Sequence, residues 1–273
     1  MSSVAAPFTL GLLAVAAALS NPRIEQWRRE IEARGGGRIV VVEVETSADQ
    51  QEIAFPADTP YGAVLRRYFL EESFTAQFLS SHALNINYFG PEGRLHFVVL
   101  NLARSGEWRD HGEALLGHEL GHAWLYVSGF RSPEYSGTRD ACLAIHAGDI
   151  VQHILIRQEL AGRGIPYEDY WMQNLEQALE RLESGGPGES RTVSRCDVAQ
   201  RLAMWADVRL GLSPGKWPSF GRFDAVMRRA FPALAPVVEE IESRLGRADV
   251  RRRTVYRLAL EFVSERLAAA AGF

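Results

Sequence analysis

The chain has 273 residues, of which 47% are hydrophobic and 23% are charged. That composition is typical of an ordinary globular protein with a sizeable core. The formal net charge is −4, and acidic and basic residues are interspersed along the sequence. Because this balance produces no electrostatic field of one sign, nucleic acid and anionic lipid are disfavoured as partners.

The N-terminal segment, residues 1–21, contains the apolar run "PFTLGLLAVAAALS". The run has the length of the apolar part of a secretion signal, although no Lys or Arg precedes it, and it is too short to span a bilayer comfortably. We expect either a signal peptide, which would favour a secreted or periplasmic protein, or a buried N-terminal helix of a cytoplasmic one. No stable membrane span is expected. The two cysteines, Cys142 and Cys196, are either bridged or two free thiols.

Helix and strand patterns alternate in the first half of the chain. After Asn21, the residues Ile24, Trp27 and Ile31 have helical spacing, and the glycines at 35–37 predict the end of that helix. The run "RIVVVEVET" that follows predicts a β-strand. Apolar spacing between 62 and 82 favours more helix, and "RLHFVVLNL", at 94–102, predicts a second strand after the turn-forming "GPEG".

The second half is predicted to be helical. A helix is expected at about 111–126, with Asp110 as its N-cap and Glu113 completing a capping box. A longer helix is expected at about 141–161. Beyond the glycine-rich linker at 183–190, we expect four further helices, at about 194–210, 221–230, 234–245 and 249–271.

These patterns together predict an α+β protein that is rich in helix. We expect a core at 22–182 with a small sheet, and a C-terminal helical region at 191–273, after a possible signal or N-terminal helix at 1–21. The sequence leaves the oligomeric state open.

The stretch "GHELGHAW", residues 117–124, is the strongest chemical signal. Four residues advance a helix by little more than one turn, so His118 and His122 lie on the same side, about 6 Å apart along the axis. Two imidazoles so placed can bind one Zn²⁺. Glu119 lies about 100° further round the helix. In that position it can act as general base toward a metal-activated water.

The residues around the motif favour a metal site over a chance match to the pattern. Leucines and alanines make the motif helix apolar on nearly every side, and burying two histidines and a glutamate there is costly unless something satisfies them. The alternative is a core helix whose histidines hydrogen-bond to the main chain. Gly117 and Gly121 each cost about 1 kcal/mol of helix propensity, which suggests close approach of another backbone element.

A catalytic zinc usually has three protein ligands, and "IHAGDIVQHILI" is the best place for the third. His146, Asp149 and His153 share one sector of an otherwise apolar helix. His153 is the favoured ligand, and Asp149 is the alternative, either as ligand or as hydrogen-bond partner of a ligand histidine. His146, Asp140 and Glu159 are further candidates, and the alternative for His146 is a position at the helix start that faces solvent.

The chain resembles the zincin superfamily of zinc metallopeptidases over about residues 94–165. The resemblance is carried by a strand, "LHFVVLN", then a helix with His118-Glu119-Leu120-Gly121-His122, then a second helix about thirty residues on. It implies zinc on the two histidines and water activation by the glutamate. It also implies that the strand before the motif helix lines the cleft and pairs with an extended substrate.

The sequence departs from each named branch of the superfamily. Gluzincins have Glu and Asp where this chain has Asp149 and His153, and metzincins have a third histidine where it has Ser128. Aspzincins have a longer pattern, of which "GTRD" at 137–140 repeats only the first half. The resemblance therefore extends to the superfamily and to no family within it.

Other residues are weighed as donors to a substrate oxyanion or as ordinary surface groups. The tyrosine candidates for such a donor are Tyr126, Tyr135, Tyr167 and Tyr170. The segment "YEDYW", 167–171, is predicted to be a packing patch, and His111 a solvated capping residue. Arg139 and Arg157 are interpreted as surface charges.

The sequence thus predicts a zinc-dependent hydrolase, a metallopeptidase acting on a peptide or protein substrate. Its metal ligands would be His118, His122 and His153, and its general base Glu119. A catalytically silent helical scaffold or binding module, and a metal-assisted hydrolase of a non-peptide amide, are the alternatives.

Overall fold

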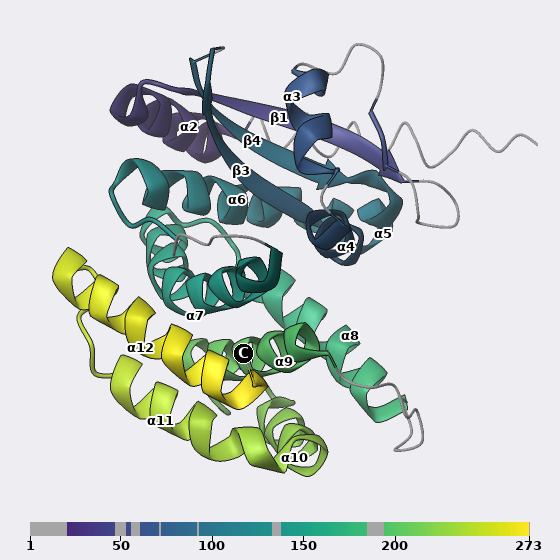
Figure 1. The fold of residues 1–273 in the computed structure, drawn as a ribbon, viewed down its shortest axis with the longest axis vertical. Helices are drawn as coiled ribbons and strands as arrows, with labels where there is room; N and C mark the ends of the chain where they lie inside the picture. The colour runs from purple at the N-terminus through teal and green to yellow at the C-terminus, as the bar shows by residue number, and fades with distance from the viewer. Residues whose placement is uncertain are drawn as a thin grey trace, which may run out of the picture. The chain divides into compact units, whose positions relative to one another are not determined.

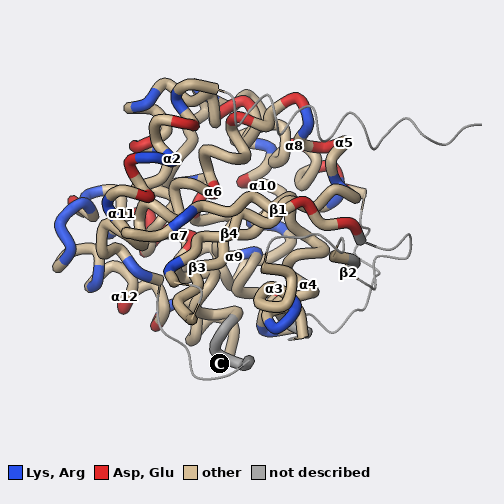
Figure 2. The backbone as a smooth tube through the Cα atoms, turned by 90° about the horizontal axis from the view of Figure 1, so that it is seen from above, with Lys and Arg blue, Asp and Glu red and all other residues tan. Residues whose placement is uncertain are grey.

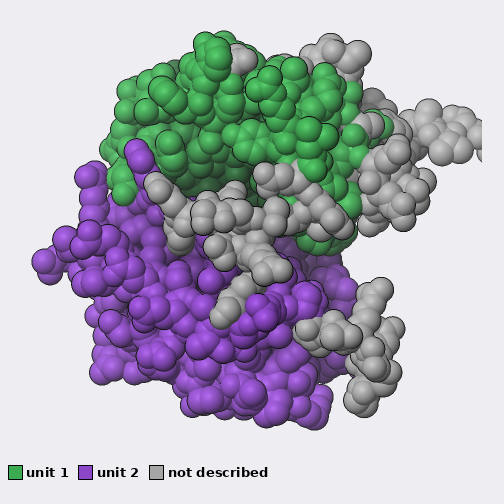
Figure 3. Space-filling model, viewed as in Figure 1, with its two compact units in different colours: residues 1–129, 159–170 green, residues 130–158, 171–273 purple. Residues whose placement is uncertain are grey.

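The structure is a computed structural model, and it describes residues 21–46, 53–55, 61–70, 72–91, 93–132, 138–184 and 194–272. The chain forms two compact units, each taken by itself below (Figure 3). Unit 1 comprises Met1–Gly129 and Glu159–Tyr170, and unit 2 comprises Phe130–Gln158 and Trp171–Phe273. The possible signal segment and most of the predicted linker at 183–190 lie outside the described residues.

Unit 1 is built around a mixed sheet. Its described strands are β1 (Arg38–Thr46), β2 (Ile53–Ala54), β3 (Ala83–Gly90) and β4 (Gly93–Asn101). Their order in the sheet is β2-β1-β4-β3, with β1 parallel to β4 and the other neighbouring pairs antiparallel. The strands β1 and β4 were predicted from their β-branched runs, whereas β3 was not predicted.

Helices cover both faces of this sheet (Figure 1). On one face lie α2 (Pro22–Gly35) and α6 (Gly112–Val127), and on the other lie α3 (Gly62–Tyr68) and α4 (Glu72–Ser80). Successive side chains of β4 point to opposite faces of the sheet. On one face, Leu95, Phe97 and Val99 pack in the core with α3 and α4. The helix predicted between residues 62 and 82 is present as these two helices.

The first helix, α2, forms as its sequence predicts. The Asn21 side chain accepts a hydrogen bond from the Arg23 backbone N–H at 2.9 Å, and Gly36 closes the helix in the left-handed conformation with φ 64°. Ile24, Trp27 and Ile31 are fully buried. Arg and Glu alternate over the opposite side of α2 (Figure 2).

The start of α6 differs from the prediction. Short turns lead into it without a break, namely η1 (Leu102–Arg104), α5 (Ser105–Trp108) and η2 (Arg109–His111). Asp110 lies within η2, and the N-cap is His111, with no side-chain capping hydrogen bond. The capping-box prediction was wrong, because the chain is already coiled at Asp110, where a capping residue would be extended. His111 does occupy the N-cap position, but its side chain makes no capping hydrogen bond.

Unit 2 is helical. Its elements are most of α7 (Thr138–Arg163), most of α8 (Glu168–Ser184), α9 (Arg195–Gly211), α10 (Phe220–Ala230), η3 (Pro232–Leu234), α11 (Ala235–Leu245) and α12 (Arg253–Ala271). Helix α9 packs on α11 and α12, and a Ser194–Asp197 capping box begins it. A disulfide joins Cys142 of α7 to Cys196 of α9, so the two cysteines are bridged.

The prediction of an α+β, helix-rich protein with a small sheet is confirmed. Among the described residues, no helix combines the length and the apolar character needed to cross a bilayer. The charged residues within the helices are of both signs (Figure 2).

Candidate metal centre

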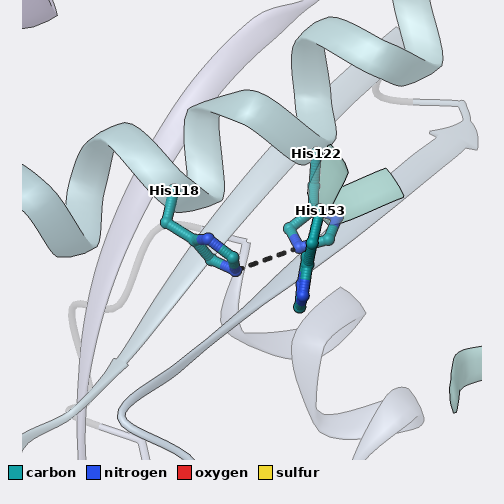
Figure 4. A group of neighbouring side chains, drawn as sticks. All are labelled: His118, His122 and His153. Carbon is teal, nitrogen blue, oxygen red and sulfur yellow. Dashed lines mark hydrogen bonds between the residues drawn. The ribbon is translucent and has the colours of Figure 1, made fainter. Parts of the chain in front are cut away.

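His118 and His122 face each other from adjacent turns of α6 (Figure 4). Their Nε2 atoms are 3.3 Å apart, and both side chains are half-buried. The rings meet edge to face, with centroids 5.0 Å apart and planes at 83°. The predicted spacing on one side of the helix is therefore the observed one.

This separation fits a shared zinc ion. Two nitrogens that each lie about 2.0–2.1 Å from a tetrahedral Zn²⁺ are separated by roughly 3.3–3.4 Å, the edge of the coordination tetrahedron. The observed Nε2–Nε2 distance of 3.3 Å has that length. Hence the two imidazoles need little rearrangement to take one cation between them.

Glu119 follows His118 directly on the motif helix. Its side chain is buried, at 5% exposure, and its backbone carbonyl accepts a hydrogen bond of 3.3 Å from Nδ2 of Asn85 on β3. Because it follows His118 directly, its carboxylate leaves the helix about 100° from the imidazole pair. The motif helix therefore carries a buried acid next in sequence to the first histidine.

The last turn of α7 belongs to unit 1 and packs closely on α6. A Cβ at Gly117 would lie 2.9 Å from Cδ2 of Leu160 and 3.0 Å from Cγ2 of Ile165. The close approach expected at Gly117 is therefore real, but side chains make it and not backbone. A residue larger than glycine at 117 would therefore require the Leu160 and Ile165 side chains to shift.

His153 lies on the same helix as Leu160, seven residues before it. Seven residues are almost two helical turns, so both side chains leave α7 on one side, about 10 Å apart along its axis. One ring nitrogen from each of His118, His122 and His153 lies within 4.8 Å of the other two (Figure 4).

The remaining candidates for a third ligand do not join this group. Oδ1 of Asp149 is 4.0 Å from Nε2 of His153, and its Oδ2 is 3.6 Å from Nδ1 of His146. Glu159 is ion-paired with Arg163 at 3.6 Å. The side chain of Asp140 lies outside the described residues. Among the described residues, the histidines alone form the metal-capable group.

A carboxylate absent from the sequence-based list holds His153. Nδ1 of His153 is 3.2 Å from Oδ2 of Asp207 on α9, and Arg157 donates to the other carboxylate oxygen. Burial would lower the pKa of His153, but the Asp207 charge and hydrogen bond raise it above the ordinary value. Burial would likewise raise the pKa of Asp207, and the charges of Arg157 and His153 lower it instead.

Arg157 is not the surface charge that the sequence suggested. Its side chain is 13% exposed, and its guanidinium lies over the Trp171 ring, 4.6 Å from the centroid. That interpretation was wrong because the pairing with Asp207 compensates for burying the charge. Arg139 has a side chain outside the described residues.

The tyrosine candidates take different positions. Tyr167 stacks on the imidazole of His118, with centroids 5.2 Å apart and planes at 10°, so "YEDYW" reaches the centre as well as packing. Tyr170 is buried and shares a 2.6 Å hydrogen bond with Nδ1 of His82. Tyr126 lies beside a histidine of β4, and Tyr135 lies outside the described residues.

The strand before the motif helix cannot receive a substrate. β4 pairs with β1 along one side and with β3 along the other, so both of its edges are used. The superfamily expectation for that strand is therefore corrected. Among the described strands, β3 forms the edge of the sheet next to β4. It contacts α6 and carries Asn85.

One residue that contacts the histidine group, Asp207, was missed from the sequence, and the position of another, Tyr167, was not predicted. Asp207 stands between the buried residues Ala206 and Val208 in α9, and a lone acid in an apolar stretch is a usable signal. Tyr167 had been weighed only as one tyrosine among several, and its ring contact depends on the turn between α7 and α8.

Comparison with known proteins adds no family to this description: no family model, curated protein or solved structure that was searched matches the chain.

Proposed function

We propose that the protein is a zinc-dependent hydrolase that acts on peptide bonds. His118, His122 and His153 would hold the metal, and Glu119 would be the general base. The observation that carries the proposal is the histidine group itself, with two Nε2 atoms 3.3 Å apart and a third imidazole nitrogen within 4.8 Å of them. Three histidines are the donor set of many catalytic zinc sites.

When bound, Zn²⁺ would lower the pKa of a coordinated water to about 7 and polarise a substrate carbonyl. The protein's own groups divide the remaining work. The three imidazoles bind and orient the cation, and Glu119 accepts the proton of the attacking water and returns it to the leaving amine. Its burial supports that role, because a carboxylate shielded from water holds a proton at a defined position.

The outer edge of β3, which pairs with no other strand among the described residues, supports a peptide as substrate. An extended peptide can add to an unpaired strand edge through main-chain hydrogen bonds, which need no particular side chains. β3 lies beside α6, to which Asn85 ties it through the Glu119 carbonyl. A peptide added to this edge would run alongside the motif helix.

Metal analysis of the purified protein tests the proposal. After dialysis against zinc and then metal-free buffer, we expect about one zinc per chain in the wild type and a large loss in His118→Ala. Arg222→Ala, which removes an exposed ion pair with Glu183, is the control and should keep its zinc. A wild-type stoichiometry near zero would favour the scaffold interpretation.

Substrate panels test the second half. Peptides and small non-peptide amides are offered to the zinc-loaded wild type and to Glu119→Gln. Turnover of peptides that disappears in the variant supports the peptidase. Turnover of small amides alone would assign the centre to a different amide hydrolase.

A further inference from the structure

Asp207 is an acidic residue in a buried, apolar stretch of α9. It lies in α9 between buried residues, and its side chain is 13% exposed. Burying a carboxylate is unfavourable unless charged or hydrogen-bonding partners compensate for it. In unit 2 these partners are His153 and Arg157, one on each carboxylate oxygen.

The hydrogen bond to His153 fixes which imidazole nitrogen carries the proton. A carboxylate only accepts, so Nδ1 must donate across the 3.2 Å separation from Oδ2. Nε2 then presents its lone pair away from Asp207. This is the tautomer and the ring orientation that metal binding through Nε2 requires.

Asp207 is itself held from the opposite side. The Arg157 guanidinium donates to Oδ1 while its face rests on Trp171, 4.6 Å from the ring centroid. Gly211 makes room for this stack, since a Cβ there would lie 2.5 Å from Cη2 of Trp171 and 2.7 Å from Cζ of Arg157. The orientation of the Asp207 carboxylate is thus fixed by its hydrogen bond to Arg157, whose guanidinium is in turn held against Trp171.

We propose that Asp207 is a positioning residue for the third metal ligand, with Arg157 and Trp171 as its support. The inference rests on the proposed function, because it takes His153 as a ligand. It adds that the metal affinity of the site is set in part from α9, by residues that never touch the cation. Outer partners of this kind typically change metal affinity by about 10–100-fold.

The test compares two buried aspartates of unit 2. Asp207→Asn removes the charge behind His153. Asp224→Asn is the matched control, because Asp224 is also held by arginines and by Trp205 Nε1, has 18% side-chain exposure, and contacts no ligand histidine among the described residues. Zinc affinity is measured by competition with a chelator, and unfolding by circular dichroism, so that stability and binding are separated.

We expect Asp207→Asn to bind zinc about 10–100-fold more weakly than the wild type, and Asp224→Asn to bind it as the wild type does while losing stability. In the cobalt-substituted protein, Asp207→Asn should also shift the d–d absorption bands, which a merely structural residue would leave unchanged. Equal zinc affinity and equal cobalt spectra in wild type and Asp207→Asn would overturn the inference and leave the hydrolase standing. A wild type that binds neither metal would remove both proposals.

A measurement on the wild type keeps the inference testable if Asp207→Asn does not fold. Long-range ¹H–¹⁵N spectra of the zinc-loaded, histidine-labelled protein report the protonated nitrogen of each imidazole. We expect His153 to carry its proton on Nδ1 and the metal on Nε2. Metal on Nδ1 of His153, or no metal on this ring, would overturn the role of Asp207.

Discussion

The Nε2 atoms of His118 and His122 point at each other across 3.3 Å. Two neutral imidazoles cannot both present lone pairs at that distance, so the contact is favourable only with a proton or a cation between them. The backbone of α6 holds this arrangement, because the two residues are one turn apart. Without a metal, one imidazole therefore donates a hydrogen bond to the other, and a cation would take the place of that proton.

Removal of the metal should destabilise the protein. A ligand that binds only the folded state at a free concentration of about 100 times its Kd raises the free energy of unfolding by roughly 2.7 kcal/mol. We expect a chelator to lower the Tm of the zinc-loaded wild type, measured by calorimetry, and to leave that of His118→Ala unchanged. The same Tm with zinc and with chelator would contradict a bound metal.

Glu119→Gln should separate chemistry from binding. The amide keeps the shape of the side chain but cannot accept the proton of the attacking water, so kcat should fall by about 10²–10⁴-fold. Zinc content, measured on the same sample, should stay at the wild-type level, because the proposed ligands are the three histidines and Glu119 does not belong to that group. Loss of zinc together with activity would make Glu119 a ligand or a structural residue.

His96, on β4, should make the stability of the protein depend on pH. Burial, assisted by the Arg94 charge, lowers the pKa of His96 from 6.5 to about 4. Between these values the unfolded chain binds a proton that the folded one refuses, so the free energy of unfolding falls as the pH falls from 6.5 toward 4. The full effect is on the order of 3 kcal/mol.

The variant that isolates this effect is His96→Asn. It keeps an N–H that can take the place of Nδ1, which is 2.6 Å from the Asn87 side-chain oxygen, but it does not titrate. In urea unfolding at a series of pH values, the slope of stability against pH should be smaller in the variant between pH 6.5 and 4. Parallel curves over that interval would mean that His96 titrates normally in the folded protein.

Two glycines of neighbouring helices should respond oppositely to leucine. At Gly117 the new side chain meets Leu160 and Ile165 at once, so we expect a loss of about 1–3 kcal/mol from overpacking. At Gly162, near the end of α7, no heavy atom lies within 4 Å of a Cβ, and leucine should gain up to about 1 kcal/mol of helix propensity. Denaturant unfolding of both variants checks the pair, and a Gly117→Leu protein as stable as wild type would refute the close packing.

Reduction of the disulfide should weaken unit 2. Cys142 and Cys196 are 54 residues apart, and closing a loop of that length stabilises a fold by roughly 4 kcal/mol in the chain-entropy account. We expect a reductant to lower the urea midpoint of the wild type. The double variant Cys142→Ser, Cys196→Ser should have the lower midpoint with or without reductant. A wild type indifferent to reductant would indicate that the bridge adds nothing to stability.

Short-range patterns predicted the parts of the fold that depend on neighbours in sequence. The apolar spacing of Ile24, Trp27 and Ile31, and the β-branched run of β1, each reflect one buried face, so α2 and β1 were found. β3 was missed, although Leu84, Ile86 and Tyr88 alternate with polar residues. The asparagines between them lower the strand propensity of that run.

The candidate site divides in the same way. The helical period alone puts His118 and His122 side by side, because both are on α6. Asp207 could not be attached to His153 from sequence, since the pairing depends on how α9 packs against α7. The stacking of Tyr167 on His118 likewise depends on tertiary packing, to which no local pattern is sensitive.

The discontinuity of unit 1 affects how the protein can be made. Residues 1–129 are synthesised first, yet the unit includes Glu159–Tyr170, and Leu160, Ile165 and Tyr167 all contact the motif helix from there. A nascent chain that has just released "HELGH" from the ribosome still lacks the side chains that cover Gly117. Fragments cut at residue 129 should accordingly aggregate, because the motif helix is enclosed only after residues 159–170 have been synthesised.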